Sequence, residues 1–468
     1  MAIDPQNTQT EDKFRDNIST VDTKGKRKWM YVFQPKGKLY NLRTYFSIFY
    51  LVLLFGLPFL KYNGNPMFLF NITKSKFIFF GQVFLPQDFV LFGIGMLVFL
   101  LFIVVFTLIF GRVFCGWACP QTIFLEMVFR KIEYWIEGPA NKQQIADSKA
   151  WTSEMYVRKT IKHIIFFLIS FLIANTFLSY IIGVDELLKI IKEPISSHVV
   201  GFTMILIFTV LFYAVFAFVR EISCIVICPY GRLQGVLLDK NSIVVIYNYL
   251  RGEPRTKKRK ETEEKIGDCI DCGMCVNVCP TGIDIRNGTQ LECVNCTACI
   301  DACNMMMKNV GLEPNLIKYG SENDVASGIK PKLTYRIKAY SVVLVILLSI
   351  LVGLLVTRDM FDSTVLRVAG QILQENKDST ISNLYKIKIV SKSGYTEPYH
   401  LEIDSKDARI EYVGKKLDSL KSGVESEETF FIKVPVEHIT KRKENLKILV
   451  KSGDKIIQTK KITFIGEY

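Results

Sequence analysis

Cysteine is missing from both ends of the chain, because all twelve cysteines lie between Cys115 and Cys303. A disulfide framework would be spread across a secreted domain, so this distribution argues against one and for metal ligands gathered in one place. The sequence also lacks a glycine-rich dinucleotide fingerprint and a P-loop. Sites for NAD, flavin or ATP are therefore not indicated.

Long apolar runs, in contrast, are abundant. Hydrophobic residues make up 49% of the 468 residues, and the mean hydropathy is +0.23. A bilayer span needs roughly 20 mostly apolar residues. Five runs approach or exceed this length, at residues 44–61, 88–110, 160–182, 199–219 and 338–357. They predict a multidomain membrane protein with about five transmembrane α-helices, and the polar segment 1–43 shows no signal-peptide pattern.

The net charge of +14 is distributed unevenly along the chain. Lys and Arg are dense before the first run, sparse in the next loop, and continue to alternate in this way up to the fifth run. By the positive-inside rule, segment 1–43 and the cysteine-rich region lie in the cytoplasm of a bacterial inner membrane, and residues 358–468 lie in the periplasm. Because the positive charge flanks the spans, no nucleic-acid partner is expected.

The chain divides into a transmembrane domain at 44–230, a cysteine-rich module with linkers at 231–337, the fifth span, and a C-terminal domain at 358–468. In this last domain, apolar and polar residues alternate in about seven short strands, which predicts a β-sandwich. It lacks the cysteine pair of antibody domains, so we predict only an Ig-like architecture with a structural or docking role. Segment 121–137 has the pattern of an amphipathic helix, either on the inner membrane face or on the surface of its loop.

Eight cysteines form two runs with the spacing of bacterial two-cluster ferredoxins, and the first run ends in Cys279-Pro280. In this pattern the fourth cysteine of each run reaches across to the other cluster. Cluster one is therefore predicted to take Cys269, Cys272, Cys275 and Cys303. Cluster two is predicted to take Cys293, Cys296, Cys299 and Cys279. Zinc is disfavoured because it does not require the third close cysteine of each run.

The other four cysteines form two Cys-x3-Cys-Pro units, Cys115 with Cys119 and Cys224 with Cys228, each at the cytoplasmic end of a predicted span. This repetition suggests an internal duplication. On a helix, i and i+4 sulfurs share one face, and two thiolates can hold Cu(I). Four thiolates would suit copper or a further [4Fe–4S] cluster. The alternative is that these cysteines act as small apolar residues.

Histidine is scarce, with four residues: His163, His198, His400 and His438. By the predicted topology, His163 lies near the inner membrane surface and His198 near the outer one. They cannot ligate one haem in a shared plane, so a b-type haem is not expected. Met305, Met306 and Met307 could offer thioethers to copper, although apolar packing over a cluster is the favoured interpretation.

Several stretches resemble the cytochrome c oxidase accessory proteins of the FixG/RdxA (CcoG) family, which are membrane-bound polyferredoxins. They are Phe84-Leu85-Pro86-Gln87-Asp88-Phe89, Cys115-Gly116-Trp117-Ala118-Cys119-Pro120-Gln121-Thr122 and Cys293-Val294-Asn295-Cys296-Thr297-Ala298-Cys299-Ile300-Asp301-Ala302-Cys303. The resemblance covers almost the whole chain and is specific in its middle two-thirds. The C-terminal domain matches by position and pattern only.

The resemblance implies a cupric reductase that supplies Cu(I) for assembly of cbb(3)-type cytochrome c oxidase. Catalysis and copper binding would fall to Cys115, Cys119, Cys224 and Cys228, with the eight ferredoxin-type cysteines as the electron relay. Expected partners are a cytoplasmic electron donor and a copper importer, copper chaperone or oxidase assembly factor. Association with further copies of the same chain into a homo-oligomer is also compatible with this interpretation. The alternative is a quinol-oxidising membrane polyferredoxin, NapH-like or NosR-like, that feeds a reductase.

Overall fold

The structure is a computed structural model. It describes residue 20 and residues 26–62, 64–73, 75–256, 266–328, 334–359, 361–368, 373–376, 378–392, 396–405, 407–414, 416–439 and 441–466. The chain forms two compact units. The first comprises Met1–Phe55, Ile94–Thr176 and Pro194–Ile350, and the second comprises Gly56–Gly93, Phe177–Glu193 and Leu351–Tyr468.

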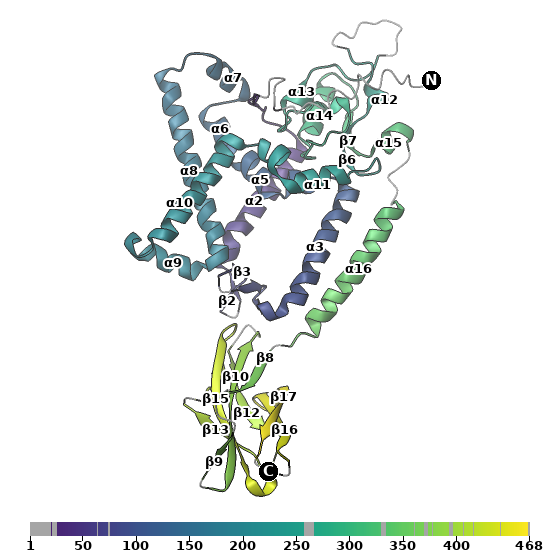
Figure 1. The fold of residues 1–468 in the computed structure, drawn as a ribbon. Helices are drawn as coiled ribbons and strands as arrows, with labels where there is room; N and C mark the ends of the chain where they lie inside the picture. The colour runs from purple at the N-terminus through teal and green to yellow at the C-terminus, as the bar shows by residue number, and fades with distance from the viewer. Residues whose placement is uncertain are drawn as a thin grey trace. The chain divides into compact units, whose positions relative to one another are not determined.

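Five helices in the described part of the chain are long and apolar enough to cross a membrane, which confirms the five-span prediction (Figure 1). They are α2 (Lys38–Gly56) with η2 (Leu57–Phe59), α3 (Phe89–Phe110), α8 (Ser153–Ile182), α10 (Val199–Ala214) with η6 (Val215–Val219), and α16 (Tyr335–Val356). Helices α2 and α8 begin earlier than the apolar runs at 44 and 160. Polar residues at their first turns remain helical although they do not contribute to the hydropathy signal.

The rest of the first unit is built from short elements that carry the cysteines. The loop between α3 and α8 contains α4 (Val113–Trp117), α5 (Pro120–Ile123), η4 (Phe124–Phe129), α6 (Arg130–Ile136) and α7 (Ala140–Ser148). After α10 come η7 (Ser223–Ile227), α11 (Pro229–Leu237), β6 (Val244–Tyr247), α12 (Tyr249–Gly252), α13 (Met274–Asn277), η8 (Ile285–Asn287), α14 (Ala298–Asn309), β7 (Ile317–Gly320) and α15 (Glu322–Ser327). Strands β6 and β7 pair antiparallel and bring the two ends of the ferredoxin-like module together.

Segment 121–137 is helical, but most of it is buried and it is not a plain surface helix. A π-helical turn, η4, interrupts it, and Phe124 and Phe129 are almost fully buried. The Phe129 ring stacks on Phe216 of η6 at 4.5 Å and meets Phe166 of α8 edge-on at 4.8 Å. The interpretation as a plain surface helix of the loop is therefore wrong, because neighbouring helices cover most of the segment. Placement on the inner membrane face stays a prediction, and Trp135 of this segment is 80% exposed.

The second unit contains two β structures. Before α3 lie β1 (Lys61–Tyr62), β2 (Asn65–Pro66), β3 (Phe68–Asn71), β4 (Lys76–Phe79), β5 (Gln82–Phe84) and η3 (Pro86–Asp88), with β3, β4 and β5 forming one antiparallel sheet. Helix α9 (Val184–Lys192) belongs to the same unit, whereas η5 (Ile195–Ser197) precedes α10. Asp88 accepts ion-pair contacts from Arg358 at 2.6 Å and Lys392 at 2.8 Å, which tie the small sheet to the C-terminal domain.

The C-terminal domain is the predicted Ig-like sandwich. One sheet has the order β13-β15-β10-β8, with β9 on β10, and the other has the order β12-β16-β17. The strands are β8 (Phe361–Arg367), β9 (Gln374–Glu375), β10 (Thr380–Ser391), β11 (Glu397–Pro398), β12 (His400–Ile403), β13 (Arg409–Val413), β14 (Ser419–Leu420), β15 (Glu425–Pro435), β16 (Lys443–Ser452) and β17 (Lys455–Ile465), with η9 (Val436–His438) after β15. Alternate residues such as Ile387, Ile389, Phe430 and Ile432 are fully buried, as the period of two along a strand requires.

Candidate metal centre

The four cysteines predicted for cluster one line a single cavity in the first unit. They are Cys269, Cys272, Cys275 and Cys303. Apolar side chains, including Met307 and Ile317, form part of the same wall. Arg286 also lines the cavity and is fixed by Asp271 at 2.5 Å and Asp284 at 2.7 Å. The cavity therefore combines thiols, an apolar wall and one held positive charge.

The four cysteines predicted for cluster two line a second cavity, which Cys275 also reaches. They are Cys279, Cys293, Cys296 and Cys299. The fourth cysteine of each run thus lies with the first three of the other run, the arrangement that the spacing predicts. Burial raises the pKa of Cys293 to about 12 and that of Cys296 to about 11, so binding of metal must displace protons. Ligation of iron by these eight residues stays a prediction.

The backbone takes the same unusual path in both runs. Asp271 (φ 49°) and Gly273 (φ 68°) flank the second cysteine of the first run, and Asn295 (φ 53°) and Thr297 (φ 66°) flank that of the second. Helices α13 and α14 begin directly afterwards and carry the third cysteine of each run. Left-handed non-glycine residues cost about 1–3 kcal/mol each and are retained mainly at functional sites. This repeated turn wraps the chain around each cavity.

The spacing of the donors fits iron–sulfur clusters better than single metal ions. Among the described residues, no group of three or more His, Cys, Asp or Glu is close enough to hold one ion. Zinc needs four ligands at bonding distance from one point. A [4Fe–4S] cubane is instead bound by thiolates spread around a larger body. Two cavities with four cysteines each match that second requirement.

Metal analysis of anaerobically purified protein is expected to give about eight irons and eight sulfides per chain, as two [4Fe–4S] clusters. Replacing Cys272 by serine should remove about four irons, because this residue lines only the first cavity. Zinc in place of iron in the wild-type protein would contradict the assignment.

The membrane cysteine units share one local structure that differs from the predicted continuous helix. Cys115 lies in α4, and Cys119 is the extended N-cap of α5 (φ −65°, ψ 125°). Cys224 lies in η7, and Cys228 is the extended N-cap of α11 (φ −71°, ψ 111°). The helix breaks between the two cysteines of each unit because the following proline disfavours a helical conformation in the residue before it and favours the first position of a new helix.

These two units lie near each other, because the Cys119, Cys115 and Cys228 thiols all act electrostatically on Cys224. Burial is the main cause that raises the pKa of Cys224 to about 12, and these three thiols contribute to the same rise. Among the described residues no three sulfurs are close enough to hold one ion, but two thiolates suffice for Cu(I). The Cys115 sulfur also lies 2.9 Å from the side-chain oxygen of Gln234, which the sequence analysis did not single out. The structure therefore supports the duplication and brings its two halves to one place.

The first membrane unit packs directly against the loop of the second cluster. A Cβ added to Gly116 would lie 2.4 Å from the Val294 carbonyl oxygen and 3.0 Å from the Cys296 Cα. Cys115, Val294 and Cys296 belong to one buried apolar cluster. Only glycine permits this close approach, so the Cys-Gly-Trp sequence is a contact surface as well as a possible ligand site.

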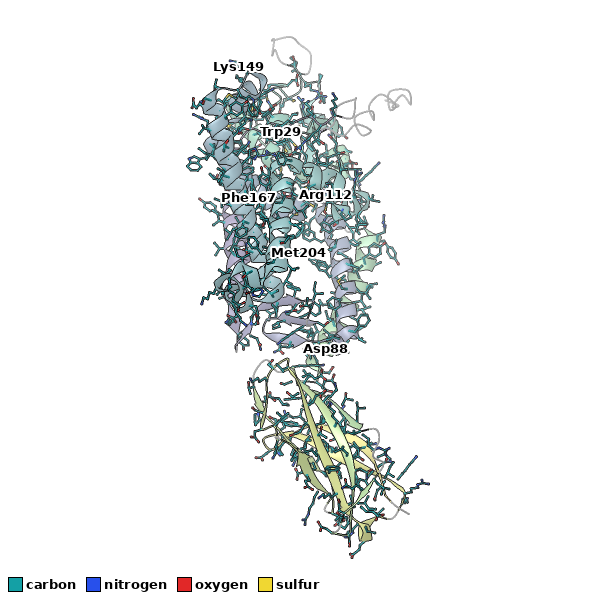
Figure 2. All side chains as sticks on the ribbon, turned by 60° about the vertical axis from the view of Figure 1, so that its left-hand side comes forward. Trp29, Asp88, Arg112, Lys149, Phe167 and Met204 are labelled. Carbon is teal, nitrogen blue, oxygen red and sulfur yellow. The ribbon has the colours of Figure 1, made fainter. Side chains whose placement is uncertain are left out.

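Arg112, labelled in Figure 2, opens the first repeated unit and lies near one thiol of each group, Cys115 and Cys293. Its guanidinium donates to the Leu291 carbonyl and is almost completely buried. Burial raises the pKa of the Cys115 thiol to about 11, and the Arg112 charge opposes that shift. It opposes the raised pKa of Cys293 in the same way. Arg112 is thus placed to stabilise negative charge at both sites.

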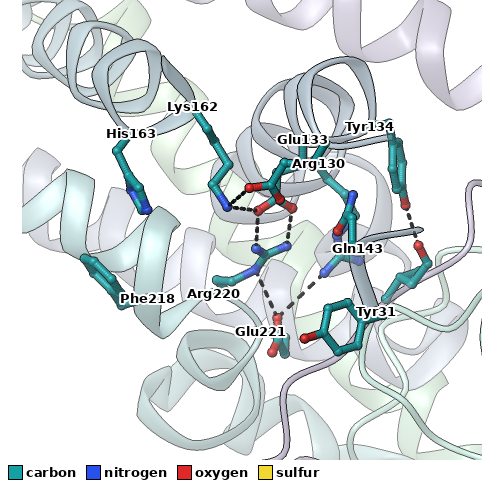
Figure 3. A network of polar contacts seen from close by, with 12 residues as sticks. Tyr31, Arg130, Glu133, Tyr134, Gln143, Lys162, His163, Phe218, Arg220 and Glu221 are labelled. Atoms are coloured by element: carbon teal, nitrogen blue, oxygen red, sulfur yellow. Dashed lines mark hydrogen bonds and ion pairs between the residues drawn. The ribbon is translucent and has the colours of Figure 1, made fainter. Parts of the chain in front are cut away.

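Arg220, which opens the second unit, anchors a buried ion network (Figure 3). Its two terminal nitrogens donate to the Glu133 carboxylate at 2.6 and 2.8 Å. Lys162 lies 3.8 Å from Glu133 and 2.9 Å from Glu137. Arg220 adopts a left-handed backbone (φ 54°) between two π-helical turns. The only sequence signal for this network was Arg220, the arginine that begins the second unit. Its carboxylate partner, Glu133, lies far away in sequence and could not be recognised.

Three protein-family models match the chain. A "4Fe-4S dicluster domain" matches residues 219–322, a "4Fe-4S binding domain" matches residues 92–139, and an "IG-like fold at C-terminal of FixG" matches residues 351–467. Together they cover both membrane cysteine units, all eight ferredoxin-type cysteines and the sandwich.

Three curated relatives align with the chain. Protein RdxA of Cereibacter sphaeroides is 34% identical over 362 residues, which cover 74% of this chain and 76% of RdxA. Protein RdxB of the same organism is 30% identical over 83% of this chain and 84% of RdxB. Nitrogen fixation protein FixG of Rhizobium meliloti is 38% identical over 56% of this chain and half of its own length. The chain therefore belongs to the FixG/RdxA family of iron–sulfur electron-transfer proteins.

Proposed function

We propose that this protein reduces Cu(II) to Cu(I) at its membrane cysteines, for assembly of a cbb(3)-type cytochrome c oxidase. The observation that carries the proposal is the contact of Gly116 with the Val294–Cys296 backbone. It joins the candidate copper ligands to the loop that would hold the second cluster. A membrane thiol site in direct contact with a ferredoxin-like module is an arrangement suited to passing electrons to a bound metal.

The residues around the thiols suit the reduction chemically. When bound, the clusters supply electrons one at a time, and each Cu(II) ion takes up one electron to become Cu(I). Soft thiolates favour Cu(I) over harder ions, so Cys115, Cys119, Cys224 and Cys228 would stabilise the product. Arg112 holds a positive charge beside these thiols and limits the negative charge that builds up as they lose protons.

The proposal is tested by anaerobic reduction with dithionite, removal of the excess reductant, and addition of Cu(II) with a Cu(I)-specific chelator. We expect Cu(I) to form as the iron–sulfur absorption returns to its oxidised level. Reoxidation by a short-chain quinone without any formation of Cu(I) from Cu(II) would favour the alternative of a quinol-oxidising polyferredoxin that feeds another reductase. Absence of Cu(I), with the clusters staying reduced, would overturn the copper proposal.

We also propose that the ferredoxin-like module faces the cytoplasm and the sandwich the periplasm, where a copper importer, copper chaperone or oxidase assembly factor would bind. The alternation of Lys and Arg supports this orientation. Reporters fused after residue 310 and after the C-terminus should report opposite sides of the membrane. A reporter at residue 149, in the loop between α3 and α8, should agree with the one at 310. The same side for residue 310 and the C-terminus would contradict the orientation.

A further inference from the structure

A pocket of about 560 Å³ opens between α8 and the end of α10, away from all twelve cysteines. Its lining includes Trp151, Tyr156, Lys159, His163, Phe167 and Tyr213. By the proposed topology it lies at the cytoplasmic ends of both helices. Phe167, one of its lining residues, is labelled in Figure 2. Tyr156 and Leu168 at its rim are more than half exposed, so the pocket can be entered from the bilayer.

A polar pair lies inside this mostly aromatic pocket. The Tyr213 hydroxyl and His163 Nδ1 are 2.9 Å apart, and the imidazole stacks on Phe218 with ring centroids 6.0 Å apart and planes 17° apart. An aromatic pocket at the membrane surface with one hydrogen-bonding pair inside offers a ligand a specific polar contact as well as apolar burial. The second imidazole nitrogen, Nε2, can exchange a hydrogen bond and a proton with a ligand.

We propose that the pocket binds a hydroquinone from the membrane quinol pool, which is the reductant of this protein. A lipid-soluble ring with a hydroxyl at each end matches an aromatic slot entered from the bilayer with one hydrogen-bonding pair inside. An acyl chain would gain nothing from His163 and Tyr213. The proposal deepens the proposed function, on which it rests, by naming the chemistry of the electron donor.

The pocket is connected to the second membrane cysteine unit by both sequence and contacts. Phe218, under the His163 ring, stands six residues before Cys224 in the same chain segment. Lys162, next to His163, pairs with Glu137 and contacts Glu133, which holds Arg220 (Figure 3).

The redox step balances with these groups. One hydroquinone loses two electrons and two protons and becomes a quinone. When bound, the two iron–sulfur clusters of the ferredoxin-like module would be the acceptor and would take up these electrons one at a time. The first proton goes to His163, and both protons leave through the Lys162 and Glu137 side to the cytoplasmic water.

Binding and reduction are measured separately on the intact, anaerobically purified protein. A short-chain quinone is titrated while tryptophan fluorescence is followed, because Trp151 lines the pocket and a bound quinone quenches it. The matching quinol is then added to the oxidised protein, and bleaching of the iron–sulfur absorption is recorded. We expect saturable quenching and bleaching of both clusters.

The informative variants are His163→Leu and Tyr213→Phe. Each should weaken quinone binding about tenfold, the equivalent of one lost hydrogen bond of about 1.4 kcal/mol. Both should slow bleaching by quinol but leave bleaching by dithionite unchanged. Phe202→Leu, on the exposed face of α10 outside the pocket lining, is the matched control and should behave as the wild type.

The outcomes separate this proposal from the copper proposal. Unsaturable quenching, or quenching that none of the pocket variants alters, would show that only lipid or detergent occupies the pocket and would overturn it. So would bleaching by quinol that survives in both pocket variants. If dithionite-reduced protein fails to reduce Cu(II), the proposed function is contradicted. The result on quinol binding is not affected by that failure.

Discussion

Replacing Cys115 and Cys119 together by serine is expected to abolish copper binding and Cu(II) reduction while iron content stays at about eight per chain. Serine is nearly isosteric with cysteine but is a poor ligand for soft Cu(I). The ferredoxin-type cysteines line their own two cavities, so their ligand sets remain complete. Copper, iron and sulfide are measured by elemental analysis on the same anaerobic preparation, after equilibration with Cu(I) and removal of unbound metal.

The paired variant of Cys224 and Cys228 should give the same result, because these thiols lie near Cys115 and Cys119 and would belong to the same copper site. Ser223→Ala is the matched control: it changes the residue beside Cys224 without removing a thiol, and it should keep copper. If the cysteine variants lose about four irons instead, the four residues hold a further [4Fe–4S] cluster. The match of residues 92–139 to a "4Fe-4S binding domain" makes a further cluster at these cysteines the specific alternative to a copper site.

Replacing Glu133 by glutamine should destabilise the protein by about 3–5 kcal/mol, since it leaves the Arg220 charge buried without its carboxylate. Both side chains are at most 6% exposed, and Lys162 and Arg220 both depend on Glu133. We expect a fall in melting temperature of about 3–5 °C for the detergent-purified protein, because the entropy of unfolding grows with chain length. The transition is followed by loss of the iron–sulfur absorption and by aggregation.

Glu154→Gln serves as the control because it removes a carboxylate from the same membrane domain but at an exposed site. Glu154 pairs with Arg158 one turn along α8, with side-chain exposures of 73% and 51%. Such a pair contributes about 0.3–0.5 kcal/mol, so its loss should hardly move the melting temperature. Equal melting temperatures for the two variants would show that the buried network is not a stabilising element.

Local patterns predicted most of the architecture. The spans follow from hydropathy within single segments, and the grouping of the eight ferredoxin-type cysteines around two cavities follows from spacings of three and four residues. The sandwich follows from alternation along strands, as Ile387 and Ile389 illustrate. Each of these features depends on residues close together in the chain, so it can be predicted from one sequence without knowing which distant segments are in contact.

The contacts between distant segments could not be predicted in this way. Gly116 meets Val294, and Arg220 meets Glu133, across long stretches of chain. The fit of a glycine against a backbone, or of a buried guanidinium on one carboxylate, depends on packing that no local period encodes. The break of each Cys-x3-Cys helix was locally encoded by proline, but the i, i+4 interpretation overlooked the restriction that proline places on the preceding residue.

The most direct test of the account is a single-turnover experiment. Protein reduced by dithionite and freed of excess reductant is mixed anaerobically with one equivalent of Cu(II), and the iron–sulfur absorption is followed by stopped flow. The account predicts rapid reoxidation with stoichiometric Cu(I) in the wild type, and reoxidation at least about 100-fold slower in Cys115→Ser/Cys119→Ser, a barrier difference of about 2.7 kcal/mol. Reoxidation of that variant at the wild-type rate would show that copper takes its electrons elsewhere and would contradict the account.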